Sequence, residues 1–296
     1  MKKFVIFTAI VGNYDKLQQP EMIDDRFDYI LFSNNISQKQ IGMWQVRNIP
    51  YYNKDYTRVA RWVKTHPEEL LNDYEASLWI DGALVINKEF VYNRIIDLYD
   101  NDYLIASMWH NQRNCIYKEA AEVVFLGLEH ERIVIDWLRK IRKEKYPENN
   151  GLFETNVIYR KHNDKKIKEI DQLWWQCIDQ FSRRDQLSFN YVLWKVKIDC
   201  LYFISAKENA RNSSHFKCVT NHVNDSKQWR KISINKKDDI LFYYYNKMPQ
   251  NAISSQRLCF WYKLITKFWF PHKMAFIIGQ YYKIKKALVS LKNFNN

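Results

Sequence analysis

Residues 77–83 read S-L-W-I-D-G-A, and this stretch decides the fold class. A short run suited to a buried strand ends at Ile80, and a carboxylate follows at Asp81. Strands that lie between two layers of helices in a parallel sheet are typically short, continuous apolar runs of this kind. Ligands of such sheets bind at the carboxyl ends of the strands, which makes Asp81 a candidate ligand-binding residue. Asp81-Gly82 between two apolar runs is also a strong hairpin signal, so a plain turn is the alternative.

Strands and helices alternate on both sides of this stretch. We predict strands from β-rich and apolar runs at residues 4–11, 28–33, 44–49, 77–80, 103–108, 152–159 and 200–204. Helical spacing of apolar residues predicts helices at 56–71, 89–99, 116–128, 132–143, 167–181 and 185–196. The order indicates an α/β fold with a largely parallel sheet covered on both faces.

The chain carries a formal net charge of +13, and this charge is unevenly distributed. Asp239 is the last acidic residue, and the sequence after it contains nine basic residues: Lys247, Arg257, Lys263, Lys267, Lys273, Lys283, Lys285, Lys286 and Lys292. Residues 240–296 therefore form a separate basic and aromatic tail, which we expect to be helical. Such a tail suits an anionic membrane surface, whereas the alternative is that its rings complete a core or a homodimer interface.

Cysteine usage and hydropathy bear on the compartment. The five cysteines are odd in number and contain no C-x-x-C pair, so neither a disulfide framework nor a structural zinc site is indicated. No run of 18 apolar residues is present, which argues against a spanning helix. We expect a cytoplasmic protein that is peripheral on the inner face of the cell membrane.

Residues 57–67 read T-R-V-A-R-W-V-K-T-H-P and place Arg58, Arg61 and Lys64 three positions apart on a predicted helix. Val59, Trp62 and Val63 form its apolar face. Arginine grips phosphate oxygens with two hydrogen bonds and lysine adds a point charge, which suits a diphosphate. A solvated basic face is the alternative.

Residues 182–186 read S-R-R-D-Q at the start of a predicted helix. Asp185 and Gln186 place a carboxylate beside an amide, which could face a sugar at its reacting carbon. Ser182 and Asp185 nearly have the spacing of a capping box, so stabilisation of the helix N-terminus is the alternative role of Asp185.

Further candidate residues follow the first strand and the strand at 103–108. Tyr14, beside Asp15, could contact a base or ribose. The segment 110–119 (H-N-Q-R-N-C-I-Y-K-E) contains His110, Arg113 and Glu119, although a lone histidine is more often structural than catalytic.

Six ordered blocks resemble a glycosyltransferase-like domain family of bacterial polysaccharide loci and of plant Golgi proteins that make wall and mucilage polysaccharides. The blocks are TAIVGNYD (8–15), TRVARWVKTHP (57–67), LWIDG (78–82), RNCIYKE (113–119), GLFETNVIYRKHN (151–163) and SRRDQLSF (182–189). They span about two thirds of the chain.

The resemblance implies a GT-A-like fold, a Rossmann-type mixed and mainly parallel sheet flanked by helices, that binds a nucleotide sugar. Asp81 takes the place of the usual metal-binding D-x-D motif, but Ala83 stands where a second aspartate is expected, which puts Mn²⁺ or Mg²⁺ binding in doubt. The resemblance further implies catalytic roles for Asp185 and Gln186. It implies donor contacts by Thr8, Ala9, Tyr14, Arg58, Arg61, Lys64, Asp81, Gly82, Asn156 and Arg184.

The expected organisation is a catalytic domain at 1–205, a connecting, acceptor-side segment at 206–239 and the tail at 240–296. The expected function is transfer of a sugar from a nucleoside-diphosphate sugar, with UDP as the expected nucleotide, to a glycan or lipid-linked acceptor in capsule or lipopolysaccharide synthesis. A noncatalytic glycan- or membrane-binding protein and a lipid amide hydrolase are the alternatives. The sequence shows no recognisable nucleic-acid-binding module and no G-x-S-x-G elbow.

Overall fold

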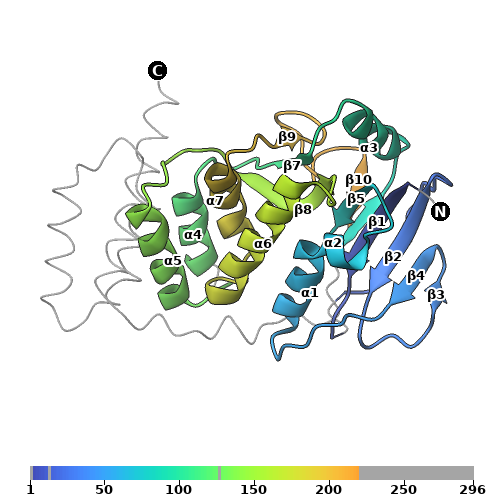
Figure 1. Ribbon diagram of the computed structural model, residues 1–296, viewed down its shortest axis with the longest axis horizontal. Coiled ribbons are helices and arrows are strands. Elements are labelled where there is room, and N and C mark those ends of the chain that lie inside the picture. Colours follow the sequence, from blue (N-terminus) through green and yellow to red (C-terminus); the bar gives the residue numbers. More distant parts are fainter. Residues whose placement is uncertain (1–2, 13–14, 126–127, 220–296) are drawn as a thin grey trace, which may run out of the picture. The chain divides into compact units, whose positions relative to one another are not determined.

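The computed structural model describes residues 3–12, 15–125 and 128–219 (Figure 1). Its main sheet has eight strands in the order β3-β4-β2-β1-β5-β8-β7-β9. In chain order these strands are β1 (Phe4–Ala9), β2 (Phe27–Phe32), β3 (Gln40–Ile41), β4 (Trp44–Arg47), β5 (Ala76–Ile80), β7 (Ile105–Trp109), β8 (Phe153–Arg160) and β9 (Leu201–Tyr202). A second, antiparallel sheet pairs β6 (Leu84–Ile86) with β10 (Phe216–Cys218).

Strand directions decide which residues share an edge of the main sheet. β1 runs parallel to β2 and β5, and β8 is antiparallel to both of its neighbours, β5 and β7. The carboxyl ends of β1, β5 and β7 therefore lie at the same edge as the beginning of β8. In α/β sheets this edge is where ligands bind.

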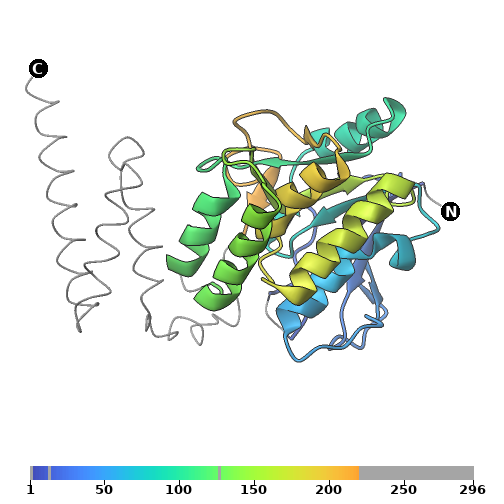
Figure 2. The same cartoon turned by 60° about the vertical axis from the view of Figure 1, so that its left-hand side comes forward.

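The helices are α1 (Tyr56–Thr65), α2 (Pro67–Leu70), α3 (Phe90–Asp100), α4 (Ile116–Phe125), α5 (Glu131–Lys143), α6 (Lys165–Gln180) and α7 (Gln186–Val196). α6 packs against both α1 and α7, and Figures 1 and 2 show these three helices side by side next to the sheet. Apolar residues of β1 alternate between the two faces, as the period of a strand requires. Ile6 joins the core that includes Ile95 of α3, whereas the ring of Phe7 packs 5.3 Å from that of Trp79.

The predicted α/β class is confirmed: a mixed, mainly parallel sheet is flanked by helices. The predicted helix at 56–71 is wrong in one respect, because it breaks into α1 and α2 at His66. Pro67 explains the break, since proline has no N–H to donate and disfavours helical backbone at the preceding residue. The short strands β3, β6 and β10 were not predicted, because two or three residues give no readable periodicity.

The described residues divide into two compact units, one of residues 3–12, 15–116 and 136–219 and the other of residues 117–125 and 128–135. The second unit contains nearly all of α4 and the beginning of α5. The boundaries expected near residues 205 and 239 stay predictions. Tyr14 and the basic tail lie outside the described residues. Among the residues that are described, no helix has both the length and the apolar character needed to cross a membrane.

Candidate active site

Two carboxylates and two cations meet where β5 ends. The Asp185 side chain is only 4% exposed, and its Oδ2 lies 2.5 Å from Lys64 Nζ. Arg61 Nε lies 3.2 Å from Asp185 Oδ1. Thr155 donates its hydroxyl to Oδ2 at 2.9 Å. Helix α1, strand β8 and the start of α7 thus contribute to one buried ionic cluster, which brings together the candidate residues Arg61, Lys64 and Asp185.

Asp81 forms the more accessible part of this cluster. Its side chain is 33% exposed, and Oδ1 accepts the indole N–H of Trp79 at 2.7 Å. Lys64 Nζ and Arg61 Nη1 lie 3.5 and 3.8 Å from the same oxygen. A ligand that approaches from solvent therefore reaches Asp81 and Arg61 before it reaches Asp185.

Backbone hydrogen bonds fix the position of Asp81. Its N–H donates to the carbonyl of Asn156 on β8, and its carbonyl accepts the N–H of Leu84 in a tight turn. A turn is therefore present, but the hairpin alternative is wrong, because β6 pairs with β10 and not with β5. A Cβ on Gly82 would lie 3.4 Å from Asp15 Oδ2, so a second carboxylate borders this turn.

Lys64 is enclosed, with 0% of its side chain exposed. Its Nζ lies 5.3 and 5.7 Å from the ring centres of Trp79 and Trp174, within range of a cation–π interaction. Burial lowers the pKa of Lys64, and the charge of Asp185 opposes that shift. Burial would likewise raise the pKa of Asp185, but the charges of Arg61 and Lys64 outweigh burial and hold that pKa well below its usual range. Asp185 is therefore an ionised carboxylate inside the protein.

A second buried ion pair supports the backbone of Lys64. Arg160 donates from Nη1 to Asp171 at 2.5 Å and from Nη2 to the carbonyl of Lys64 at 2.6 Å. The side chains of Arg160 and Asp171 are fully buried. Because one guanidinium joins β8, α6 and the end of α1, it limits the movement of the helix that carries Lys64 and Arg61.

Arg58 differs from Arg61 and Lys64, with which it forms a stripe of basic residues three positions apart on α1 (the basic stripe). It donates to the carbonyls of Ile178, Asp179 and Phe181 at the end of α6. These carbonyls have no partner within the helix, so Arg58 satisfies them. The solvated-face alternative is wrong for the stripe, since Arg58 and Arg61 are partly buried and Lys64 is fully buried. Arg61 and Lys64 thus belong to the ionic cluster, whereas Arg58 donates hydrogen bonds to the end of α6.

The capping alternative for Asp185 is also wrong. Asp185 takes the N-cap position of α7, but its side chain makes no capping hydrogen bond. The indole N–H of Trp174 instead holds its carbonyl at 2.9 Å. Gln186 begins the helix and is partly exposed, as is Arg184 on the other side. Gln186 is thus the accessible neighbour of a buried carboxylate.

The remaining predicted residues occupy different places. Thr8 and Ala9 are buried at the end of β1. Asn156 lies on β8 and donates to Glu154 Oε2 at 3.1 Å. His110 follows β7 at the same edge of the sheet, where its Nδ1 accepts backbone N–H groups of the following loop.

Arg113 belongs to this loop, since its N–H is one of the donors to His110 Nδ1, at 3.0 Å. Glu119 lies on α4, in the second compact unit.

The described residues do not by themselves make a metal site. No three His, Cys, Asp or Glu side chains gather there with the geometry of a metal centre. Asp81 Oδ1 already accepts an indole N–H and lies near an ammonium and a guanidinium. These two positive charges would repel a divalent cation at the same oxygen. This donor set does not fit a protein-held Mn²⁺ or Mg²⁺, and we derive no step through one.

Sequence reasoning missed Thr155, Trp174, Arg160 and Asp171. Thr155 and Arg160 lie inside the block at 151–163, whose proximity to Asp81 and Lys64 depends on the antiparallel insertion of β8 beside β5. A strand order was needed to see that contact. Asp171 carried a weak signal, as an acidic residue among the positions of α6 that turn out to be buried.

Comparisons with known proteins identify the family of the chain. The TOD1/MUCI70, glycosyltransferase-like domain family matches residues 1–225, and the chain belongs to this family. A curated relative is the probable hexosyltransferase MUCI70 of Arabidopsis thaliana, which is 28% identical over an alignment of 173 residues. The match covers 53% of this chain and 29% of the relative. The chain thus spans less than a third of that relative. The resemblance inferred from the six blocks is confirmed, as is the expectation of a glycosyltransferase at the level of the family.

Two of the solved structures that the chain matches are named as glycosyltransferases. The galactosyltransferase LgtC, in complex with donor and acceptor sugar analogues, matches 86% of this chain and 98% of its own at 10% identity and a TM-score of 0.41. The bifunctional WbbM, in its apo form, matches 68% of this chain and 38% of its own at 11% identity and a TM-score of 0.38.

Proposed function

We propose that the protein transfers a hexose from a nucleoside-diphosphate sugar, with UDP as the expected nucleotide, to a glycan or lipid-linked glycan acceptor. The observation that supports this most is the ionic cluster of Arg61, Lys64, Asp81 and Asp185 at the ligand-binding edge of the sheet. Its cations come from one helix and its carboxylates from the ends of two other elements.

Arg61 is the cation that can meet the diphosphate, since its side chain is 15% exposed. Sugar transfer places negative charge on the departing diphosphate, and a cation fixed in advance stabilises that charge without reorganisation. Lys64 is fully enclosed and acts through Asp185 and Asp81, which it holds in place. In this proposal the protein's own cations neutralise the leaving group.

In this proposal Gln186 and Asp185 have different roles at the donor sugar. Both oxygens of Asp185 are engaged, by Arg61 on one side and by Lys64 and Thr155 on the other. Its fixed negative charge favours positive charge that develops on the sugar ring in the transition state. Gln186, partly exposed on the first turn of α7, presents its amide to the donor sugar.

The proposal is tested by UDP release from a panel of UDP-sugars in the presence of glycan acceptors. Gln186→Ala and Asp185→Asn should each lower turnover at least about a hundredfold if the group acts in the transition state. Gln180→Ala, at the exposed end of α6, is the control and should leave turnover unchanged. Equal turnover by all four proteins would refute the roles of Asp185 and Gln186, and the noncatalytic glycan-binding alternative would then be favoured.

Association with an anionic membrane is a further part of the proposal, and it is supported only by sequence. The nine basic residues after Asp239 are each worth about 1 kcal/mol near an anionic surface. Such a surface would place the site near a lipid-linked acceptor in polysaccharide synthesis. Co-sedimentation with anionic vesicles, lost in high salt and on truncation after Asp239, would support it, and equal recovery of both proteins in the supernatant would refute it.

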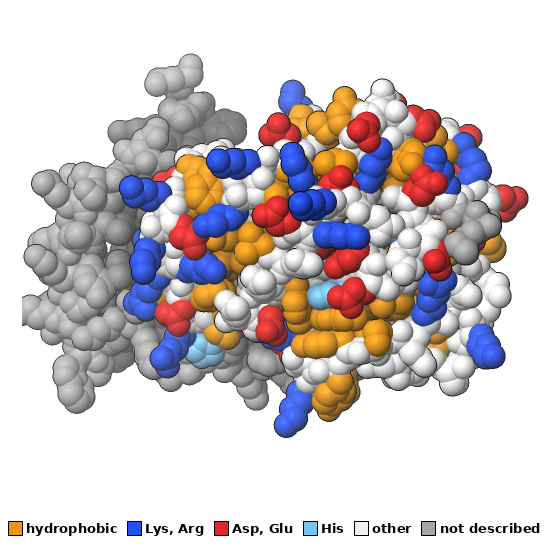
Figure 3. Space-filling model, viewed as in Figure 1, with side chains coloured by type: hydrophobic (Ala, Val, Ile, Leu, Met, Phe, Trp, Pro, Cys, Tyr) orange, Lys and Arg blue, Asp and Glu red, His pale blue; other side chains and the backbone are white. Residues whose placement is uncertain are grey.

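Nucleic-acid binding is not favoured by the charge pattern that can be seen. On the face shown in Figure 3, lysine and arginine side chains are scattered among acidic and uncharged ones. A nucleic-acid-binding face instead gathers its basic side chains into a patch or stripe.

A further inference from the structure

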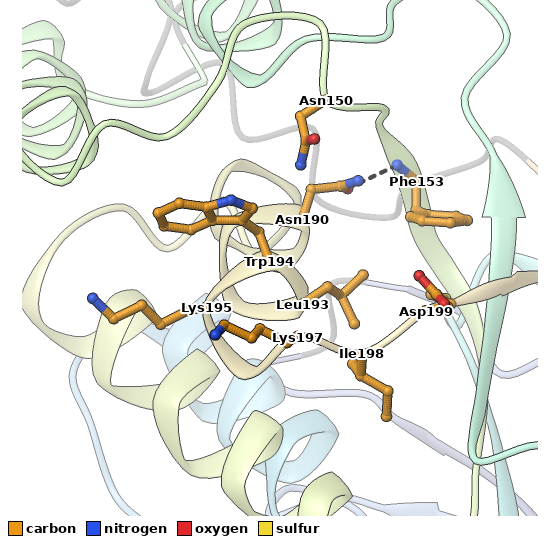
Figure 4. Close-up of a pocket in the computed structure, with 10 residues that line it drawn as sticks. Asn150, Phe153, Asn190, Leu193, Trp194, Lys195, Lys197, Ile198 and Asp199 are labelled. Atoms are coloured by element: carbon orange, nitrogen blue, oxygen red, sulfur yellow. Dashed lines mark hydrogen bonds between the residues drawn. The ribbon is translucent and has the colours of Figure 1, made fainter.

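A cavity of about 780 Å³ opens beside the C-terminal half of α7. Its volume falls in the range of ligand-binding clefts, about 300–1,000 Å³. Figure 4 shows its wall, which combines α7 with the segment that leads into β8 and the turn that precedes β9. The lining residues that bear on its chemistry are Asn150, Phe153, Asn190, Trp194, Lys197 and Asp199.

This cavity is separate from the ionic cluster, although both use α7. Asn190, Leu193, Trp194 and Lys197 follow one another at helical spacing, so they lie along one face of the helix and just beyond its end. Asp185 lies before the first turn, where its side chain instead pairs with Lys64 of α1. A ligand in the cavity would therefore not displace a donor from the cluster.

Asn190 places a fixed hydrogen-bond donor on the wall. Asn190 is only 4% exposed, and its Oδ1 accepts the N–H of Phe153 at 3.0 Å (Figure 4). That bond fixes which way the amide faces, and Nδ2 makes no hydrogen bond to another residue in the described part of the chain. A Cβ on Gly151 would lie 3.7 Å from Nδ2, and Gly151 has φ +79°. That distance is an ordinary van der Waals contact, so the positive φ, and not a lack of space, favours glycine at this position.

Trp194 supplies a rigid aromatic surface. Its ring lies 5.4 Å from Tyr146 at an interplanar angle of 89° and 6.0 Å from Tyr191 at 38°. The residue is nevertheless only partly buried, and Figure 4 shows Trp194 and Phe153 on opposite sides of Asn190. A held aromatic ring beside polar groups suits a ligand with one apolar face and hydroxyl groups at its edge, which describes a pyranose.

The charges around the cavity are balanced. Lys195 and Lys197 contribute two cations, but Lys195 Nζ lies 2.5 Å from Glu144 Oε2, and Asp199 adds a second carboxylate. A diphosphate or an acidic sugar would gain little net attraction here, unlike at Arg61. An uncharged sugar residue suits the cavity better.

We propose that this cavity is a second binding site, which takes a neutral pyranose residue of the acceptor glycan while transfer takes place at the ionic cluster. The choice of a glycan as ligand rests on the proposed function. Asn190 Nδ2 donates to a sugar hydroxyl, and Trp194 contacts the apolar face of the ring. The site thereby retains the acceptor chain independently of the donor.

The test is a titration of the full chain with neutral xylo-, gluco- and galacto-oligosaccharides, followed by saturation-transfer NMR. Trp194→Ala and Trp194→Leu should each weaken glycan binding about tenfold or more. The leucine variant keeps a larger apolar side chain than alanine next to Tyr146 and so controls for lost packing. Trp175→Ala removes a partly exposed tryptophan elsewhere, beside Tyr51, and should leave glycan affinity within about twofold as the matched control. UDP affinity should not change in either Trp194 variant.

Two results would overturn the proposal: no oligosaccharide of the panel binds the wild-type chain, or both Trp194 variants bind as wild type does. A UDP titration of the same samples separates this proposal from the proposed function. If glycans bind through Trp194 but UDP does not bind at all, the glycan site stands and the nucleotide-sugar proposal fails. If UDP binds but no glycan binds, the nucleotide-sugar proposal stands and the glycan site fails.

Discussion

Lys64→Met is the sharpest test of the ionic cluster, because methionine keeps an unbranched apolar side chain, one atom shorter, and removes the ammonium group with its charge and its hydrogen-bond donors. Without Lys64, Asp185 stays buried with Arg61 Nε at 3.2 Å and the Thr155 hydroxyl at 2.9 Å. Removal of one partner of a buried ion pair costs about 3–5 kcal/mol. Because Arg61 remains, we expect the lower end of this range, a loss of about 3 kcal/mol in the free energy of unfolding.

Urea unfolding followed by tryptophan fluorescence measures this loss. Lys54→Met removes an exposed lysine that precedes the same helix and should change stability by no more than about 0.5 kcal/mol. The double variant Lys64→Met/Asp185→Asn should recover part of the loss, because it leaves no uncompensated buried charge. The reasoning is refuted if Lys64→Met costs less than about 1 kcal/mol, or if the two substitutions add without coupling.

Two more predictions concern pH and metal. Burial lowers the pKa of His162 to about 4, so the folded protein keeps this side chain neutral while the unfolded chain takes up a proton below about 6.5. The contribution of His162 to stability should therefore be complete above pH 6.5 and fall by up to about 3 kcal/mol as the pH drops to about 4. Urea titrations of wild type and His162→Gln over this pH range measure that contribution as the difference between the two proteins, and the same slope in both would speak against the assignment. For the metal, UDP affinity measured in EDTA should match that in Mn²⁺ within about twofold, because Arg61 supplies the positive charge; a tenfold dependence on Mn²⁺ would show that the nucleotide and Asp81 recruit a cation.

Most of the fold could be predicted because its elements have strong local signals. Every strand of the main sheet except β3 was expected from its β-rich or apolar run. β3 and β9 each have only two residues, but β9 lies within the longer apolar run at 200–204. The interruption at Pro67 shows the limit of periodicity, since apolar spacing continues across a residue that the backbone cannot accommodate inside a helix. The pairing of β6 with β10 joins residues 84–86 to 216–218, and no local pattern predicts a contact over that separation.

The site was predicted in part for the same reason. Asp81 could be found because a carboxylate at the end of a buried strand is a local feature. The contact of Asp185 with Lys64 could not, because it depends on how α7 and α1 lie in three dimensions. Arg58 shows a related limit. Its spacing on the helix is the same as that of Arg61 and Lys64, but spacing does not reveal that it donates to three backbone carbonyls at the end of α6.

Calorimetric titration with UDP tests the central claim most directly, because it asks whether the ionic cluster is a nucleotide-sugar site. We predict that the wild-type chain binds UDP and that Arg61→Ala weakens binding by about 1.5–3 kcal/mol, the range for a hydrogen bond to a charged group. Arg139→Ala, which removes a guanidinium that is 70% exposed on α5, should bind as wild type does. Unchanged affinity in Arg61→Ala, or no binding of any nucleoside diphosphate by the folded wild-type chain, would contradict the account.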